Sequence, residues 1–166
     1  MSKKNTEHKF CNNDIIWYIT SSAAAVIAIL LIILGTSKYG PGISADSVAY
    51  MHAARSLAAG KGYVYFGFDA PFVQWPPLYP SLLAIAELFR LDVATAANYL
   101  NAFILGLIIF IFGVWAAKNI RYRIYVLWGL VALVFSVPLL YVSRYVWSEP
   151  LFILLLLLFI IEVEKY

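Results

Sequence analysis

The sequence predicts an all-α integral membrane protein with about four transmembrane helices and two interfacial helices in the first outer loop. Hydrophobic residues make up 63% of the 166 residues and charged residues only 13%, and the mean hydropathy is +0.83. A soluble domain of this length would expose far more charge. The apolar residues also gather in long uncharged runs, separated by short basic loops. The small net charge of +3 is spread over these loops, so we expect no nucleic-acid partner.

Four apolar runs define the expected membrane crossings. The first begins at Ile15 and is long enough for the roughly 30 Å hydrocarbon core at about 1.5 Å per residue. It follows basic residues as a signal peptide would, but no small-residue cleavage site precedes Lys38, so we interpret it as a retained anchor. The last run is purely apolar only over 150–161, about 18 Å by the same rise, which is short for a crossing. The expected transmembrane segments are about 15–34, 96–117, 124–142 and 148–164.

Basic residues predict the orientation of these segments, because they favour the cytoplasmic side of short loops. With four crossings, all three basic clusters fall on one side of the membrane; they are Lys3, Lys4 and Lys9, the loop 118–123, and Lys165. Residues 1–14 are then a cytoplasmic tail, and the outer loop 35–95 faces outward together with 143–149. We therefore expect a multi-pass protein of the cytoplasmic membrane whose active face points outward.

The outer loop 35–95 carries signals for two helices. Ser44 is a suitable N-cap for a helix over 45–59, which Gly60 would terminate. Pro76 and Pro77 suit the first turn of a second helix that reaches about Arg90. That second helix is mostly apolar but too short to cross, so we expect it to lie in the membrane interface. Trp75 and Tyr79 would suit an aromatic belt at the level of the headgroups.

Two acidic residues on the outer side are the candidate catalytic groups. Asp46 lies in the first turn of the first expected helix of this loop, and Glu149 opens the fourth apolar segment. A carboxylate at a helix start is favoured by the helix dipole by roughly 0.3–1 kcal/mol and needs no function to explain it. If the two helices pack, however, the paired acids would suit general-base chemistry on a hydroxyl, with or without a divalent cation. The metal requirement is unknown from these residues.

Further outer-side residues are candidates for substrate binding. Tyr50 lies one turn after Asp46 on the same helix face. Each outer cation alone is explained by a headgroup contact or by a snorkelling side chain. As a group they would suit a phosphate, which guanidinium groups bind well. The substrate-binding candidates are Tyr50, Arg55, Lys61 and Arg144.

The order of these motifs resembles the N-terminal part of the GT-C membrane glycosyltransferases. The resemblance is to the branch with protein O-mannosyltransferases, lipid A aminoarabinose transferases and bacterial Rgt-type sugar transferases, and it runs from about Asp46 to Leu155. The chain would thus be a partial GT-C module over 15–166. The motifs are Asp46-x-x-x-Tyr50, Ala54-Arg55-x-Leu57-Ala58-x-Gly60, Pro76-Pro77-Leu78-Tyr79-Pro80-x-Leu82-Leu83-Ala84 and Ser148-Glu149-Pro150-Leu151-Phe152.

The resemblance implies a reaction and its participants. It makes Asp46 the acid-base residue and Glu149 the second acid, and it implies a polyprenyl-phosphate-linked sugar donor. The sugar would pass with inversion to a hydroxyl of a lipid, glycan or protein acceptor. Two positions depart from the pattern: Ser47 stands where many relatives have a second acid, and Gln74-Trp75 where some have a basic residue. Relatives are several times longer, so we expect the chain to be a fragment.

Two other classes of function were weighed against the glycosyltransferase. The alternative is a small non-catalytic membrane subunit that binds or presents a lipid, since the acids and cations then need only dipole and headgroup contacts. A flippase or transporter would carry charged residues within the spans. The expected spans are uncharged, so this class ranks last.

Overall fold

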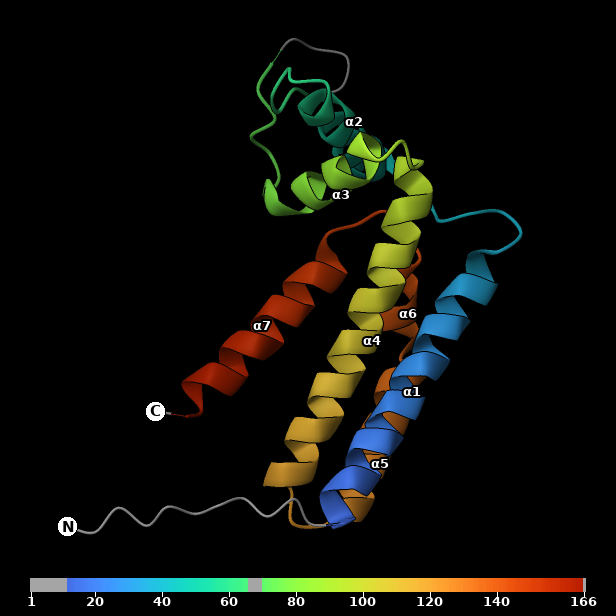
Figure 1. Ribbon diagram of the computed structural model, residues 1–166, viewed down its shortest axis with the longest axis vertical. Helices are drawn as coiled ribbons and strands as arrows, with labels where there is room; N and C mark the ends of the chain where they lie inside the picture. Colours follow the sequence, from blue (N-terminus) through green and yellow to red (C-terminus); the bar gives the residue numbers. More distant parts are fainter. Residues whose placement is uncertain (1–11, 66–69, 166) are drawn as a thin grey trace, which may run out of the picture.

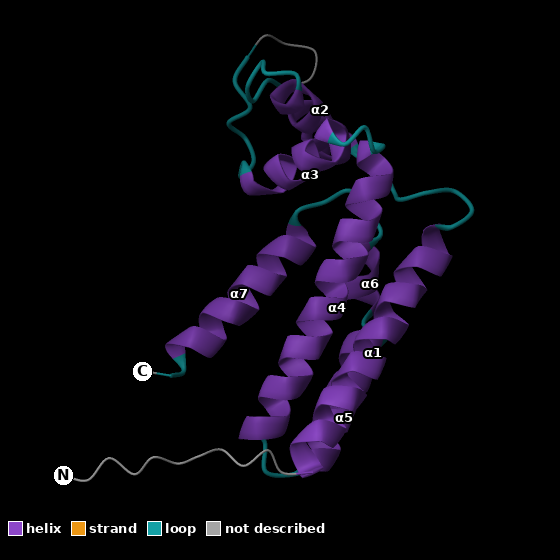
Figure 2. Ribbon diagram, in the orientation of Figure 1, coloured by secondary structure: helices purple, strands orange, loops and turns teal. Residues whose placement is uncertain are grey.

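The computed structural model describes residues 12–65 and 70–165, and this part of the chain is helical with loops and no named strand. The N-terminal basic residues of the expected cytoplasmic tail lie outside it. Figures 1 and 2 show long helices that run side by side and two short helices that sit at one end of them. The helices are α1 (Asn12–Thr36), α2 (Ala45–Ala58), α3 (Leu78–Leu88), α4 (Val93–Asn119), α5 (Arg123–Val134), α6 (Val137–Ser143) and α7 (Glu149–Val163).

Within residues 12–65 and 70–165, two helices are long and apolar enough to cross a membrane. They are Asp14–Thr36 within α1 and Val93–Asn119, which is α4. The bent pair of α5 and α6 makes a third if it counts as one span. With 15 residues, α7 is about 22 Å long, which is shorter than the roughly 30 Å core. The chain is thus an all-helical protein of membrane character, whereas four separate crossings were expected.

The third expected segment is not one continuous helix. α5 and α6 meet at a bend of 44°, and Ser136 between them has an extended backbone with φ of −66° and ψ of 107°. Pro138 follows at the second position of α6. Proline has no N–H to donate to the carbonyl four residues earlier and its ring crowds that carbonyl, so a helix is interrupted there. The break was not anticipated from the apolar run alone.

α1 and α4 form the most extensive helix pair and run side by side. Small residues let the two backbones approach. A Cβ atom at Gly106 would come within 2.6 Å of Ile29 Cδ1, and one at Gly113 would collide with the buried Ser21. Close approach through small residues is the usual way in which membrane helices associate.

α2 and α3 pack on each other at the end where α1 finishes and α4 begins. The predicted N-cap is confirmed, because Ser44 and Ser47 form a reciprocal capping box at the start of α2. Their shared core consists of small and aromatic side chains, among them Ala53 and Tyr79. Tyr79 is only 1% exposed, so its assignment to an exposed aromatic belt was wrong. The ring of Tyr50 in α2 contacts it edge to face, with ring centres 5.1 Å apart.

Candidate functional site

The two candidate acids lie at the start of two different helices. Asp46 is in the first turn of α2 and is half-buried, while Glu149 is the first residue of α7 and is exposed. Ser44 caps α2 with its side chain. Pro150 suits the first turn of α7, where its missing N–H would have had no helical partner. Local sequence therefore fixes where each acid stands on its own helix.

A backbone junction between two loops brings these helix starts together. The N–H of Gly42 donates to the carbonyl of Arg144 at 2.8 Å, and the N–H of Val146 donates to the carbonyl of Gly42 at 3.2 Å. Glycine is required here, because a Cβ at Gly42 would lie 2.6 Å from the ring of Tyr145. The loop before α2 is thus joined to the loop before α7, although about a hundred residues separate them.

Two side-chain hydrogen bonds tighten the same junction. Trp147 Nε1 donates to Ser44 Oγ at 2.7 Å, and the Tyr50 and Ser148 hydroxyl groups are 2.8 Å apart. Ser148 stands at the N-cap of α7, yet its side chain makes no capping hydrogen bond. Serine normally caps a helix start, so its contact with Tyr50 replaces a local stabilisation by a long-range one.

Both acids act electrostatically on one buried phenol. Tyr50 is 3% exposed, and burial raises its pKa above the ordinary value of 10.0. The negative charges of Glu149 and Asp46 raise this pKa further, and the hydrogen bond with Ser148 opposes them. Burial likewise raises the pKa of Tyr79, with smaller contributions from Tyr50 and Glu149, while Asn101 opposes them. The structure therefore brings Asp46, Tyr50 and Glu149 into one neighbourhood.

Asn101 of α4 is part of this neighbourhood and was not among the residues selected from the sequence. It is fully buried, and its Nδ2 donates to the carbonyls of Tyr145 at 2.7 Å and Trp147 at 3.2 Å. It thereby anchors the loop before α7 to α4. The sequence feature that could have identified Asn101 is an amide side chain inside an otherwise apolar run. Polar side chains within a span are costly and commonly functional.

Two of the candidate cations do not lie at the acids. Arg55 follows Asp46 by nine residues on α2, about 13 Å along the helix. Its charge acts on Asp92, whose pKa is lowered first by the backbone and side-chain hydrogen bonds of Thr95 and less by Arg55. Lys61 is exposed beyond the end of α2. Both lie in other parts of the segment between α1 and α4.

Arg144 occupies a separate aromatic pocket next to the junction. The pocket has a volume of about 280 Å³, and its lining residues are Tyr39, Gly40, Pro41, Gly42, Tyr141, Arg144 and Tyr145. The guanidinium group donates to the carbonyl of Gly35 at 3.2 Å, near the end of α1. Tyr145 stacks on Trp147 with ring centres 4.6 Å apart, so this aromatic wall connects the pocket to the junction.

Two carboxylates alone make a poor metal site. In the described part of the chain, no group of three or more His, Cys, Asp or Glu side chains is close enough to hold a metal ion. Magnesium-type cations are commonly held by one or two carboxylates together with substrate phosphates. Asp46 and Glu149 fit a divalent cation only in that second way, with a phosphate supplying further ligands.

Comparisons with known proteins identify no family, so any assignment of function depends on the geometry of the site. No protein-family model, no curated protein and no solved structure was found to match this chain. Within the described residues, the structure is a helical protein with two helices long and apolar enough to cross a membrane, and Asp46 and Glu149 both lie near Tyr50 at one end of the bundle.

Proposed function

We propose that the chain is the N-terminal part of a GT-C-type glycosyltransferase that uses a polyprenyl-phosphate-linked sugar. The observation that supports it is the joined start of α2 and α7, where Asp46 and Glu149 both act on the buried Tyr50. A structural protein gains the dipole stabilisation at each helix separately. It gains no such stabilisation from a contact between two helix starts in which Ser148 bonds Tyr50 and does not cap α7.

In this proposal the carboxylates, and not the two buried tyrosines, are the basic groups. A phenol whose pKa lies above its ordinary value stays protonated near neutral pH, so Tyr50 and Tyr79 can donate a hydrogen bond but cannot accept a proton efficiently. In the proposed reaction, Asp46 takes the proton of the acceptor hydroxyl as its oxygen bonds to the anomeric carbon. The bond from that carbon to the lipid phosphate breaks, and the electron pair leaves with the phosphate.

The remaining residues have supporting roles in this proposal. Tyr50 orients the sugar through its hydroxyl group, and Glu149 orients the acceptor. Arg144 is the cation closest to the junction along the chain and contacts the donor phosphate, whereas Arg55 and Lys61 contact headgroups or a more distant part of the substrate. A divalent cation, when bound between the acids and the phosphate, would supply charge neutralisation. The acceptor hydroxyl belongs to a lipid, glycan or protein.

The proposed substrate also predicts where the site lies relative to the membrane. The isoprenoid tail keeps the donor in the bilayer, so its phosphate lies at the depth of the headgroups, where α2, α3 and the loop before α7 meet. We place this end on the outer face of the cytoplasmic membrane, with four crossings if α7 completes the fourth. A non-catalytic subunit that binds or presents a lipid is the competing function, and it predicts no dependence on the charge of Asp46.

The experiment compares Asp46→Asn with Asp92→Asn. Both positions are acids at helix starts in the outer region. Asp92 caps α4, where asparagine substitutes well, and at Asp46 in the first turn of α2 asparagine loses only the dipole stabilisation of roughly 0.3–1 kcal/mol. In membranes that contain the full protein and a lipid-linked sugar extract, Asp46→Asn should reduce transfer by roughly 10²–10⁴-fold, the usual contribution of a positioned general base. Asp92→Asn should leave transfer within a few-fold of the native rate. Near-native transfer by a well-expressed Asp46→Asn protein would remove the catalytic assignment.

A further inference from the structure

The indole of Trp75 packs in the aromatic cluster around Tyr50 and has no role so far in the proposed reaction. Its ring centre is 6.0 Å from that of Tyr50, 5.9 Å from that of Tyr65 and 5.6 Å from that of Phe72. The planes of Tyr65 and Phe72 lie within 25° of the indole plane. Offset stacking of this kind limits the motion of a ring. The loop before α3 therefore holds the indole in one orientation.

The indole nitrogen of Trp75 is a hydrogen-bond donor without an acceptor. In the described part of the chain Trp75 Nε1 has no partner, whereas the indole nitrogens of Trp115 and Trp147 each donate to a side chain at 2.7 Å. Trp75 is half-buried, and its nitrogen is not among the buried polar atoms that lack a partner. Solvent or a ligand can therefore reach it. An indole N–H can only donate, and it usually finds a partner where the ring is packed.

This donor belongs to the same neighbourhood as the two acids. Asp46 and Tyr50 are four residues apart on α2, about 6 Å along the helix, and the indole of Trp75 packs against the ring of Tyr50. The hydroxyl group of Tyr50 lies 2.8 Å from that of Ser148, the residue before Glu149. A sugar whose anomeric carbon lies at Asp46 therefore has its other hydroxyl groups near the aromatic cluster.

On the basis of the proposed function, we infer that Trp75 binds the donor sugar, with Nε1 donating a hydrogen bond to one of its hydroxyl groups. Sugar hydroxyl groups accept such bonds, whereas an isoprenoid tail has no acceptor. Trp75 would thereby distinguish a lipid phosphate that carries a sugar from one that does not, because a site built to bond a hydroxyl group rejects a ligand that lacks it. The flanking rings fix the direction of the donor before the sugar binds, which lowers the entropy cost of binding.

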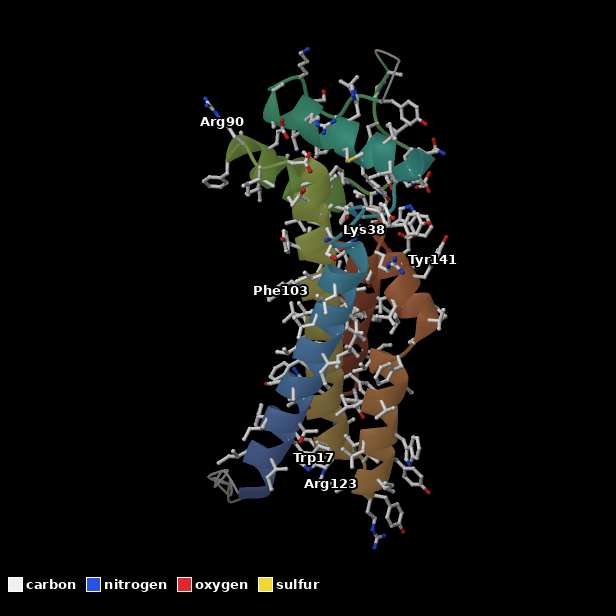
Figure 3. The ribbon with its side chains drawn as sticks, turned by 90° about the vertical axis from the view of Figure 1, so that its right-hand side faces the viewer. Trp17, Lys38, Arg90, Phe103, Arg123 and Tyr141 are labelled. Atoms are coloured by element: carbon white, nitrogen blue, oxygen red, sulfur yellow. The ribbon has the colours of Figure 1, made fainter. Side chains whose placement is uncertain are left out.

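Transfer by the full protein at increasing amounts of lipid-linked sugar extract tests this contact. Trp75→Phe keeps a ring against Tyr50 and removes the N–H group, so the amount of extract that gives half the maximal rate should rise by about threefold to tenfold. The maximal rate should stay within about twofold, as for a lost binding contact. Trp128→Phe is the matched control and should behave like the native protein. Trp128 is 65% exposed on α5, and Figure 3 shows Arg123, where α5 begins, at the end of the bundle opposite α2. A native half-maximal amount in Trp75→Phe would overturn the inference.

Tryptophan emission detects the same contact without requiring transfer. The difference between the native protein and Trp75→Phe isolates the emission of Trp75. In detergent solution the lipid-linked sugar extract should shift this emission, and polyprenyl phosphate without a sugar should leave it unchanged. No shift with the extract, or an equal shift with both lipids, would overturn the inference. A shift in a native protein that transfers no sugar would support the contact at Trp75 and contradict the proposed transfer, so the two failures can be told apart.

Discussion

At the scale of single residues, the buried phenol of Tyr50 connects the sequence to the proposed chemistry. Its hydroxyl group contacts Ser148, and its ring packs against Phe72, Trp75 and Tyr79. Aromatic packing of this kind limits the motion of a ring and fixes where its hydroxyl group points. The two acids therefore face a polar group whose position is determined by its neighbours.

The raised pKa values of Tyr50 and Tyr79 predict how stability depends on pH. The folded protein holds these two protons more tightly than the unfolded chain, so this contribution is complete below pH 10.0 and is lost as the pH rises through the folded pKa values. The free energy of unfolding in detergent should fall as the pH rises above about 10. Tyr50→Phe combined with Tyr79→Phe should make that fall shallower, as measured by chemical unfolding at each pH. An unchanged slope in the double variant would show that these phenols are not protected by burial.

At the scale of elements, most helices follow from local sequence, and the site does not. The uncharged runs predicted α1 and α4, and Ser44 predicted the start of α2, because apolar length and capping are local properties. To predict the bend between α5 and α6, one would have to give Pro138 more importance than the apolar run that extends on both sides of it. The junction at Gly42 depends on two loops far apart in the chain, and no periodicity or spacing reveals such a contact. For that reason the two acids were identified but their meeting was left open.

The contact between α4 and the loop before α7 gives a prediction at this scale. Asn101→Ala removes both hydrogen bonds to that loop, whereas Asn98→Ala removes one to Thr36 of α1. Loss of buried hydrogen bonds costs roughly 1–3 kcal/mol. Hydrogen exchange over 144–148 should therefore accelerate in Asn101→Ala and stay near the native rate in Asn98→Ala. Equal acceleration in both variants would mean that the loop depends on general packing and not on Asn101.

At the scale of the whole molecule, the chain has two chemically different ends. Asp46, Glu149, the tyrosine-lined pocket and helices α2 and α3 gather where α1 ends, and the basic residues of the loop between α4 and α5 gather at the opposite end. A membrane across the long helices would separate the two groups.

Labelling of introduced cysteines tests this separation, after the single native Cys11 is replaced by serine. Lys61→Cys and Asn119→Cys occupy exposed positions at the two ends and should react with a membrane-impermeant maleimide from opposite sides. Lys165→Cys should react from the same side as Asn119→Cys if α7 completes a crossing. Reaction of Lys61→Cys and Asn119→Cys from one side would contradict the arrangement of the spans.

The central claim is that Asp46 and Glu149 work as one site, and a double-mutant cycle of sugar transfer tests it most directly. Residues that act as a unit in catalysis give strongly non-additive losses when they are removed together. We expect the Asp46→Asn/Glu149→Gln protein to transfer sugar at about the rate of Asp46→Asn alone, with expression and membrane insertion like those of the native chain. Losses that multiply, so that the double variant falls by the product of the two single effects, would show that the two acids act independently.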